Sequence, residues 1–359
     1  MSSHGEKDEL HDHENGPPPA RVEESRHSPT SPPPQTATAP PVRSYHPFSV
    51  QVIALLIPGA IFGLLARLGL DALATYDGQS VFPLAWVQGM GCFIMGLAVG
   101  LREPISAYYP PLFTAITTGF CGSLTTFSSW QLDMFLAWSN GGGFHRIWIY
   151  DIMDGLTKTL LTLMVSLSSL SFGVHIASHI LPYTPALTKI VPPSRLTQHI
   201  VTTLSIIAYA LTIVFYFRLS HRFRHEATAA LLFAFPGALT RHTFSINLNP
   251  IYPPLPLGTL SANAFGTALL AIFHVLQRLS GSGAPSATAC ALLQGLMDGY
   301  CGCLTTISSF AVEVRGLKGR RGWVYVGVSW TIGQLIMVVV VGSAWWSGRI
   351  KESQRCAYT

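Results

Sequence analysis

Charged side chains are scarce in this chain. Of its 359 residues only 11% are Asp, Glu, Lys or Arg, and 49% are hydrophobic, whereas a soluble globular protein carries about 25% charged residues. This shortage excludes an ordinary soluble enzyme and, with a positive mean hydropathy, predicts an integral membrane protein. The net charge of +5 comes from Arg and Lys at the ends of apolar segments. Without a basic stripe, nucleic acid is not expected as a partner.

The chain also lacks the short motifs of catalytic and nucleotide-driven proteins. It has no Walker loop, no C-x-x-C pair and no grouping of nucleophile, base and metal ligands. We therefore expect neither an enzyme nor an ATP-driven pump. Four histidines resemble helix-end residues rather than metal ligands: His175, His179, His221 and His225.

Six cysteines are present, and five of them lie inside apolar segments. In such surroundings a thiol behaves as a small hydrophobic side chain, which is favoured here over a metal site or a disulfide. These five are Cys92, Cys121, Cys290, Cys301 and Cys303.

The amino-terminal residues have a composition unlike the rest of the chain. They are rich in Pro, Ser, Glu and His and contain almost nothing to bury, so residues 1–46 are predicted to form a disordered tail. They lack the charged start, apolar middle and small-residue cleavage site of a secretory signal. The first apolar span, which begins near Phe48, is expected to act as an uncleaved insertion signal.

Long apolar segments make up the remainder. A helix needs about 20 apolar residues to cross the hydrocarbon layer of a membrane, and this criterion predicts nine transmembrane helices. They lie near residues 51–75, 82–101, 111–138, 155–181, 199–218, 227–247, 257–279, 286–314 and 322–346.

A twelve-residue string occurs twice inside these segments. GFCGSLTTFSSW at residues 119–130 recurs as GYCGCLTTISSF at residues 299–310, with eight of the twelve residues identical. Because the string is rich in Gly, Thr and Ser, it is a poor lipid-facing helix. We expect each copy to be a broken helix that lines a polar path.

Shorter matches extend the repeat. GLLAR at residues 63–67 matches GALTR at 237–241, and QGMG at 88–91 matches NAFG at 263–266. Spans one to four and six to nine are thus two copies of one unit. The unpaired fifth span starts the second copy on the opposite side of the bilayer, which predicts an all-α protein of two inverted four-helix repeats. The even division of Arg and Lys between the two sides leaves the absolute orientation open.

The predicted organisation has five parts. These are the tail at residues 1–46, a first repeat at 47–182, a linker with the fifth span at 183–225, a second repeat at 226–347 and a short tail at 348–359.

This set of motifs resembles the Fluc/FEX (CrcB-like) fluoride channel family. Each copy carries G-x-x-x-R in its first span, N-x-x-G or a variant of it in its second, and a variant of G-x-x-T-T-F-S-x-F in its third. The match covers nearly everything from about residue 50 to 346. The family has a bacterial form, in which two small subunits pair antiparallel, and a eukaryotic form that fuses two units through an extra helix. This chain resembles the fused form.

The resemblance implies a site. In the family, carbonyls at the broken third helices hold a structural sodium ion, and the matching residues are Gly122, Thr125, Gly302 and Thr305. The residues that match the fluoride pathway, or are expected to donate hydrogen bonds along it, are Asn263, Phe127, Phe310, Thr306, Ser308, Tyr325 and Ser329.

Several positions depart from the family pattern. Gln88 replaces Asn, and Trp130 and Ile307 replace Phe. The fourth span has Leu156 and Leu160 at the positions that match Tyr325 and Ser329 of the ninth. The resemblance implies two equivalent paths in the dimeric form of the family. Because the altered residues collect in one of these paths, we expect one conducting path and one degenerate path in this chain.

The ordinary alternatives for these residues remain open. Phenylalanines in membrane helices mostly pack, and an Asn such as Asn263 often bonds a neighbouring helix. Thr125 and Thr305 are able to bond back to their own helical turns. Two arginines are costly inside a bilayer and are expected near its edge or in a wet vestibule: Arg67 and Arg241.

Two acidic residues follow the repeated strings at the same spacing, Asp133 and Glu313. They are expected to cap or anchor the broken helices, because a carboxylate beside the path would repel an anion. A small, strongly hydrated anion needs hydrogen-bond donors in place of water.

The favoured function is a passive fluoride-selective channel in the plasma membrane that works as a single chain, an internal pseudo-dimer. The alternative is a secondary anion transporter coupled to protons or sodium, since inverted repeats with broken helices are common in that class.

Overall fold

The structure is a computed structural model that describes residues 45–218, 228–279 and 281–357. The predicted disordered tail lies almost entirely outside these residues, as do His221 and His225. In the part that is described, every regular element is a helix, and the only β-type pairing is an isolated antiparallel bridge between Leu279 and Ile350.

The first copy begins with two long helices and ends with a third. Between them the chain is helical in short pieces, one of them a π-helix (η1). The elements are α1 (Val50–Ala74), α2 (Pro83–Gly100), α3 (Arg102–Tyr108), α4 (Pro110–Thr114), η1 (Ala115–Cys121), α5 (Gly122–Leu124), α6 (Phe127–Trp138) and α7 (Trp148–Ile180).

Two short 3₁₀ turns and one long helix follow. They are η2 (Leu181–Tyr183), η3 (Leu187–Lys189) and α8 (Arg195–Arg218). Helix α8 packs against α1 and α9, and most of its apolar side chains are exposed. Such a surface suits contact with lipid.

The second copy repeats the order of the first. Its elements are α9 (Ala229–Leu248), α10 (Leu257–Gln277), η6 (Gly281–Gly283), α11 (Ala287–Gly295), η7 (Leu296–Cys301), α12 (Gly302–Leu304), α13 (Ser308–Gly316), α14 (Arg320–Met337), η8 (Val338–Gly342) and α15 (Ser343–Trp346).

Six helical segments in the described residues are long and apolar enough to cross a membrane. They correspond to predicted spans one, two, four, five, seven and nine. Spans three and eight are divided into short pieces, and the sixth is α9, which is not among the six. The chain is thus an all-helical, multi-pass membrane protein.

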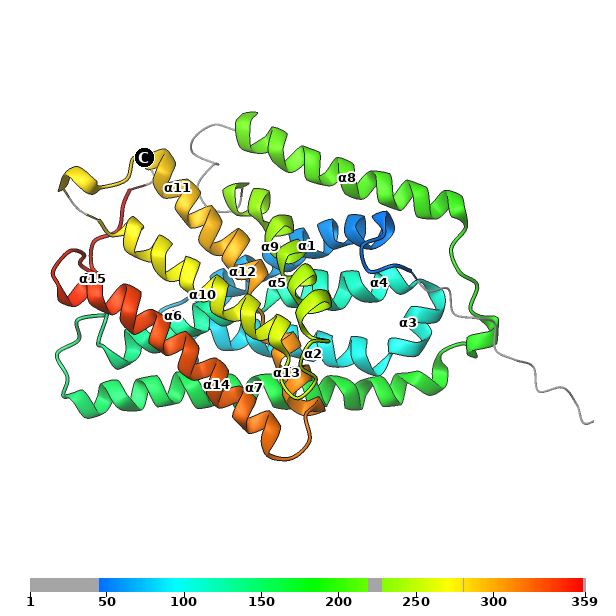
Figure 1. Cartoon of the computed structure of the whole chain (residues 1–359), viewed down its shortest axis with the longest axis horizontal. Coiled ribbons are helices and arrows are strands. Elements are labelled where there is room, and N and C mark those ends of the chain that lie inside the picture. Colours follow the sequence, from blue (N-terminus) through cyan, green and yellow to red (C-terminus); the bar gives the residue numbers. More distant parts are fainter. Residues whose placement is uncertain (1–44, 219–227, 280, 358–359) are drawn as a thin grey trace, which may run out of the picture. The chain divides into compact units, whose positions relative to one another are not determined.

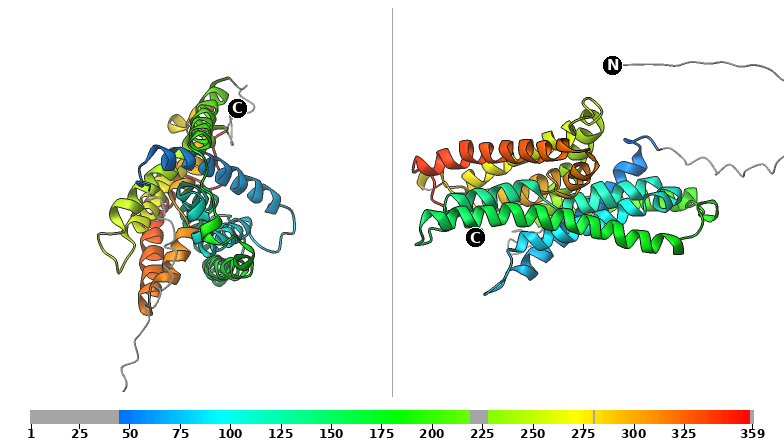
Figure 2. Two further views of the ribbon diagram at one scale, coloured as in Figure 1. Left: turned by 90° about the vertical axis from the view of Figure 1, so that its right-hand side faces the viewer. Right: turned by 90° about the horizontal axis from the view of Figure 1, so that it is seen from below.

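The long helices α7 and α14 run in opposite directions (Figures 1 and 2). In Figure 1 α7 starts at the left, after α6, and runs to the right, whereas α14 leads left into α15. Of the pieces of the two third spans, α6 and α13 each pack against both of these helices, and α5 packs against α12. The largest buried cluster also lies there and includes Phe127 and Phe310.

One prediction about the cysteines is wrong. Cys290 is not a free buried thiol but forms a disulfide with Cys356. The other four cysteines are buried and unpaired, as expected. Cys356 lies outside the apolar segments, so nothing in the periodicity of the sequence connects it with Cys290.

Candidate functional site: two facing helix breaks

Each third span is broken at the first Thr of its repeated string. Thr125 and Thr305 both have φ −89° and ψ 151°, which is extended backbone, and helices resume at Phe127 and Ser308. The break predicted from the Gly, Thr and Ser content is confirmed in both copies. The two copies of the repeated string thus have the same backbone conformation at the break.

A carboxamide side chain from the second helix of each copy holds each break. Asn263 on α10 accepts from Thr306 N (2.9 Å) and donates to Thr306 O (3.2 Å). Gln88 on α2 makes the same pair of contacts with Thr126, at 3.3 and 2.6 Å. The longer Gln88 therefore replaces the expected Asn without loss of these bonds. Because a carboxamide has two N–H donors, each retains a second one.

The hydroxyl groups at the breaks cross from one copy to the other. Thr125 Oγ1 accepts from Ser308 N (3.0 Å) and contacts Thr306 Oγ1 (3.1 Å). Thr305 Oγ1 reciprocally accepts from Ser128 N at 3.2 Å. In each break the first Thr thus accepts a hydrogen bond from a Ser backbone amide of the other copy.

Besides these bonds between the copies, both threonines bond back to their own helical turns, which is the alternative interpretation of the sequence. Thr125 and Thr305 also donate to carbonyls in their own preceding turns, Cys121 O at 3.1 Å and Cys301 O at 2.9 Å. Each Thr therefore bonds back to its own helix and also caps the resumed helix of the other copy.

The breaks also release backbone carbonyls. In an unbroken helix, the amides of Thr126 and Ser129 would bond the carbonyls of Gly122 and Thr125. Here they donate instead to Gln88 Oε1 and Thr126 Oγ1. Gly302 and Thr305 lose their usual donors in the same way, because Thr306 N binds Asn263 and Ser309 N binds Thr306 Oγ1. Freed carbonyls at unwound helices suit a sodium ion, so this donor set fits the predicted site.

Arg67 and Arg241 are not where the sequence predicted them. Both are buried, at 6% and 1% exposure, rather than in an exposed vestibule. Arg67 donates to Asp298 O and Arg241 to Thr118 O, each in the π-helix of the opposite copy. Backbone carbonyls therefore solvate these charges in the interior.

The glycines of the repeated string make room for these guanidinium groups. A Cβ at Gly302 would overlap Arg67, and one at Gly122 would overlap Arg241. A side chain at either glycine would therefore force the guanidinium group to move. The motif G-x-x-x-R in the first helix of one copy and the Gly in the third helix of the other form a single contact.

Aromatic rings lie beside the breaks. The rings of Phe127 and Phe310 are 5.8 Å apart, and Phe310 and Tyr325 are 4.9 Å apart. The structure thus brings three predicted pathway residues together. Phe127 also contacts Trp130 at 5.5 Å, so residues assigned to the two predicted paths are in contact with one another.

The structure changes the predicted register of the fourth span. Leu156 and Leu160 are 40% and 53% exposed, so they do not face the site. The indole of Trp130 instead donates to Lys158 O at 3.0 Å, much as Phe310 contacts Tyr325. Lys158 therefore corresponds to Tyr325, and Thr162 to Ser329, two residues later than the sequence comparison placed them.

A narrow cavity of about 10 Å³, room for roughly one water molecule, lies on this side of the breaks. Thr162 and Ser166 of α7 line it together with Ile307 and Phe310. Sequence reasoning missed both hydroxyl residues. Their spacing of four residues, which places both hydroxyls on one face of a helix, was the available signal. Among the described residues, Thr162 Oγ1 and Ser329 Oγ have no hydrogen-bond partner.

Glu313 anchors the resumed helix of the second copy. Its carboxylate accepts from Tyr325 Oη (2.8 Å), Thr259 Oγ1 (2.5 Å) and Asn249 Nδ2 (3.5 Å). These contacts agree with the anchoring role predicted for Glu313. They also place an acid next to a predicted pathway residue, which the sequence did not show.

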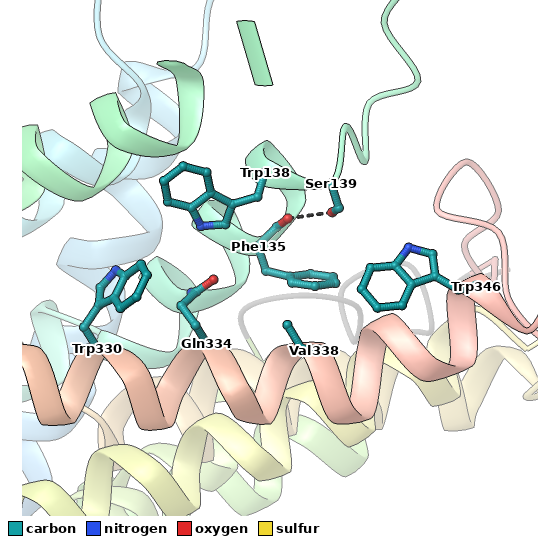
Figure 3. Close-up of a pocket in the computed structure, with 7 residues that line it drawn as sticks. All are labelled: Phe135, Trp138, Ser139, Trp330, Gln334, Val338 and Trp346. Atoms are coloured by element: carbon teal, nitrogen blue, oxygen red, sulfur yellow. Dashed lines mark hydrogen bonds between the residues drawn. The ribbon is translucent and has the colours of Figure 1, made fainter. Parts of the chain in front are cut away.

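A larger surface cavity of about 450 Å³ lies between α6 and the end of α14 (Figure 3). Among the described residues, no charged side chain lines it. Figure 3 shows rings arranged around it, among them Trp138, Trp330 and Trp346. It is apolar and separate from the helix breaks, so we do not include it in the candidate site.

Comparison with known proteins matches both copies of the repeat to one family. A family model described as CrcB-like protein, Camphor Resistance (CrcB), matches residues 54–174 and again residues 228–343. The two matched regions fall on the two copies and leave α8 between them. The chain belongs to the CrcB-like family. The resemblance drawn from the paired motifs, including the fused two-copy form, is confirmed.

Curated relatives of this CrcB-like protein are named for fluoride. Fluoride export protein 1 of Neurospora crassa is 34% identical over 82% of this chain and 66% of that protein. Its namesake in Candida albicans is 34% identical over 85% of this chain and 82% of that protein. The fluoride-specific ion channel FluC of Nitrosospira multiformis is 36% identical over 29% of this chain and 80% of FluC. No solved structure matches the chain.

Proposed function

We propose that this protein is a passive fluoride-selective channel of the plasma membrane, which lets fluoride leave the cytoplasm as a single chain. The names of its relatives support fluoride as the ion. The observation that carries the proposal is the pair of facing breaks, where carboxamide and hydroxyl donors and aromatic rings from both copies meet. Such a set offers hydrogen bonds to a small anion that has lost its water.

The architecture that we propose is nine spans in two inverted four-helix repeats. The reciprocal contacts of the two breaks support it, as do the opposite directions of α7 and α14 (Figures 1 and 2). In this arrangement α8 is the unpaired span that reverses the second copy.

The conducting path is assigned to Phe127, Phe310 and Tyr325 with their polar neighbours. Phenylalanine offers a positive ring edge to an anion, and Tyr325 packs against Phe310 while its hydroxyl donates to Glu313. The polar neighbours that complete the path are Asn263, Thr306, Ser308 and Ser329.

The second path is assigned as degenerate. Its substituted residues are Gln88, Trp130 and Ile307. Support comes from Trp130, whose indole N–H is used by Lys158 O, and from Ile307, whose aliphatic side chain has no ring edge to offer.

A structural sodium ion belongs to the proposal. The freed carbonyls of Gly122, Thr125, Gly302 and Thr305 would hold it, and its charge would raise the potential felt by an anion nearby. Replacing sodium by a large organic cation on both sides of the membrane should then lower fluoride flux. Flux unaffected by this replacement would argue against the ion.

The deciding experiment is fluoride efflux from liposomes that contain the purified chain. With valinomycin to balance charge, we expect fast electrogenic fluoride efflux and no chloride efflux. Protein-free liposomes serve as the control. Equal chloride flux, or none of either ion, would contradict the proposal.

A second candidate is a proton-coupled anion transporter. It is favoured by Glu313, a titratable carboxylate bonded to Tyr325. At zero membrane potential and neutral pH, a proton gradient would drive such a transporter to accumulate fluoride against its gradient. A channel would not do so, and its flux would survive Glu313→Gln.

A further inference from the structure

The carboxyl-terminal segment, residues 348–357, is fastened to the second copy. Cys356 is bonded to Cys290 at the start of the broken third span, with 5.9 Å between the two Cα atoms. This separation is typical of a disulfide. The pair joins residues 66 positions apart, so it connects the end of the chain to the helix that leads to the break.

Other contacts hold the segment independently of the disulfide. Glu352 Oε2 lies 2.8 Å from Arg278 Nε and 3.1 Å from His274 Nε2. Cys356 N donates to Gln277 O at 3.0 Å. Ile350 is buried and bridges Leu279. These contacts therefore hold the segment beside α10 and α11, so that Cys356 lies next to Cys290 without the help of the disulfide.

The Glu352 carboxylate of this segment is stabilised in its ionised form. Burial by itself would raise the pKa of Glu352. The hydrogen bond from His274 and the charge of Arg278 lower this pKa by more than burial raises it, so the net shift is downward. The carboxylate thus remains ionised between its two basic partners.

The segment also reaches toward the break through side chains. Arg355 donates to Gln294, and Gln294 donates to Asp298 Oδ2 at 2.6 Å. The carbonyl of Asp298 accepts from Arg67. At the repeat offset, Pro110 occupies the position of Cys290 in the first copy, so this connection belongs to the second copy alone.

Disulfides persist in oxidising compartments and are rare in the cytosol. We infer that Cys290 and Cys356 form a structural disulfide on the extracytoplasmic side, which fixes the carboxyl-terminal segment over the ends of α10 and α11 and sets the orientation of the chain. Thiol–disulfide exchange makes the bond: the two thiols become one disulfide while a disulfide of an oxidoreductase is reduced to two thiols.

The orientation has consequences along the chain. The loops after α10 and after α15 lie outside, so the loops that precede α10 and α14 face the cytoplasm. The Glu313 and Tyr325 pair, near the start of α14, then lies toward the cytoplasm. With nine spans, the amino terminus is also cytoplasmic. This inference does not depend on which ion the protein carries.

Thiol counting on the full chain, taken directly from the cells that express it, tests the bond. Free thiols are blocked with N-ethylmaleimide under denaturing conditions, and the protein is then reduced and treated with a polyethylene-glycol maleimide. The wild type should gain two labels only after reduction, and Cys290→Ser/Cys356→Ser should gain none. A wild type without the gain overturns the disulfide.

Protease treatment of intact cells tests the side. A carboxyl-terminal epitope tag should be digested, while an amino-terminal tag on the same chain should survive until the cells are permeabilised. A carboxyl-terminal tag that resists until permeabilisation overturns the orientation. Reductant should lower the melting temperature of the wild type and leave the double variant unchanged. Since the thiol count and the protease test are both read on the wild-type chain, they hold even if the double variant folds poorly.

Discussion

The two carboxamide side chains at the breaks hold the backbone in place and are also assigned to the two proposed paths. Asn263 and Gln88 hold equivalent turns through the same pair of hydrogen bonds, so a purely structural role would make them equally sensitive to substitution. Only a difference in position along the conducting path would separate them. This makes the two residues matched controls for one another.

Replacing the amide of Asn263 by a carboxylate should abolish fluoride flux. Asn263→Asp removes a donor and places a negative charge against Thr306 O and the passing anion. Gln88→Glu is the same chemical change in the first copy and should retain most of the flux per folded protein if that path is degenerate. The measurement is liposome efflux, normalised to the monodisperse fraction of each variant. Equal loss in both would rule out a single conducting path.

Gly302→Ala should destabilise the protein by about 1–3 kcal/mol, the usual cost of overpacking, because the new methyl group would overlap the Arg67 guanidinium. Gly327→Ala on α14 is the control, since its Cβ meets open space, and it should not destabilise. Thermal unfolding in detergent measures both. A Gly302→Ala melting curve like that of Gly327→Ala would refute the proposed close contact.

At the level of elements, the two broken spans stabilise each other. The resumed helix of each copy has a backbone amide capped by a Thr of the other copy. Unpaired backbone groups inside a membrane are costly, so a break in one copy requires the other copy. One broken third span would not be stable alone in lipid, because the backbone amide at the start of its resumed helix would have no acceptor.

Thr305→Val should cost about 1–3 kcal/mol of stability, because it leaves the buried amide of Ser128 without its acceptor. The control is Thr157→Val, where an exposed hydroxyl bonds only Met153 O of its own helix. Its effect should stay within about 0.5 kcal/mol. Unfolding in lipid nanodiscs separates the two, and equal stability would show that the crossed bond contributes little.

At the level of the whole molecule, one chain supplies both sets of residues. Phe127 comes from the first copy and Phe310 and Tyr325 from the second. The donors at each break are likewise contributed by both copies. We therefore expect that one chain completes the site.

A single chain should then be sufficient for flux. In liposomes reconstituted at low protein density, the fraction that loses fluoride should follow the Poisson probability of receiving one or more chains. Fluorescently labelled protein should bleach in one step per active vesicle. A fraction that grows with the square of protein density would instead indicate an obligate dimer of chains.

The sequence by itself determined the membrane class, the repeat and the helix breaks. Apolar length fixes where helices cross a bilayer, and the Gly, Thr and Ser content of the repeated string removes the helical preference at Thr125 and Thr305. These are local properties of the chain. Motif order was sufficient to indicate the family, because several short matches recur twice at nearly one offset.

Only the tertiary structure decided what the long-range partners are. The sequence predicts that Arg67 lies near the membrane edge or in a vestibule. In the structure it is buried and donates to the Asp298 carbonyl of the other copy. The register of α7 against the breaks, and the pairing of Cys290 with Cys356, depend on which faces pack together. Neither follows from periodicity, because the contacts join residues far apart in the chain, and their free energy arises only when both copies and the carboxyl-terminal segment are folded.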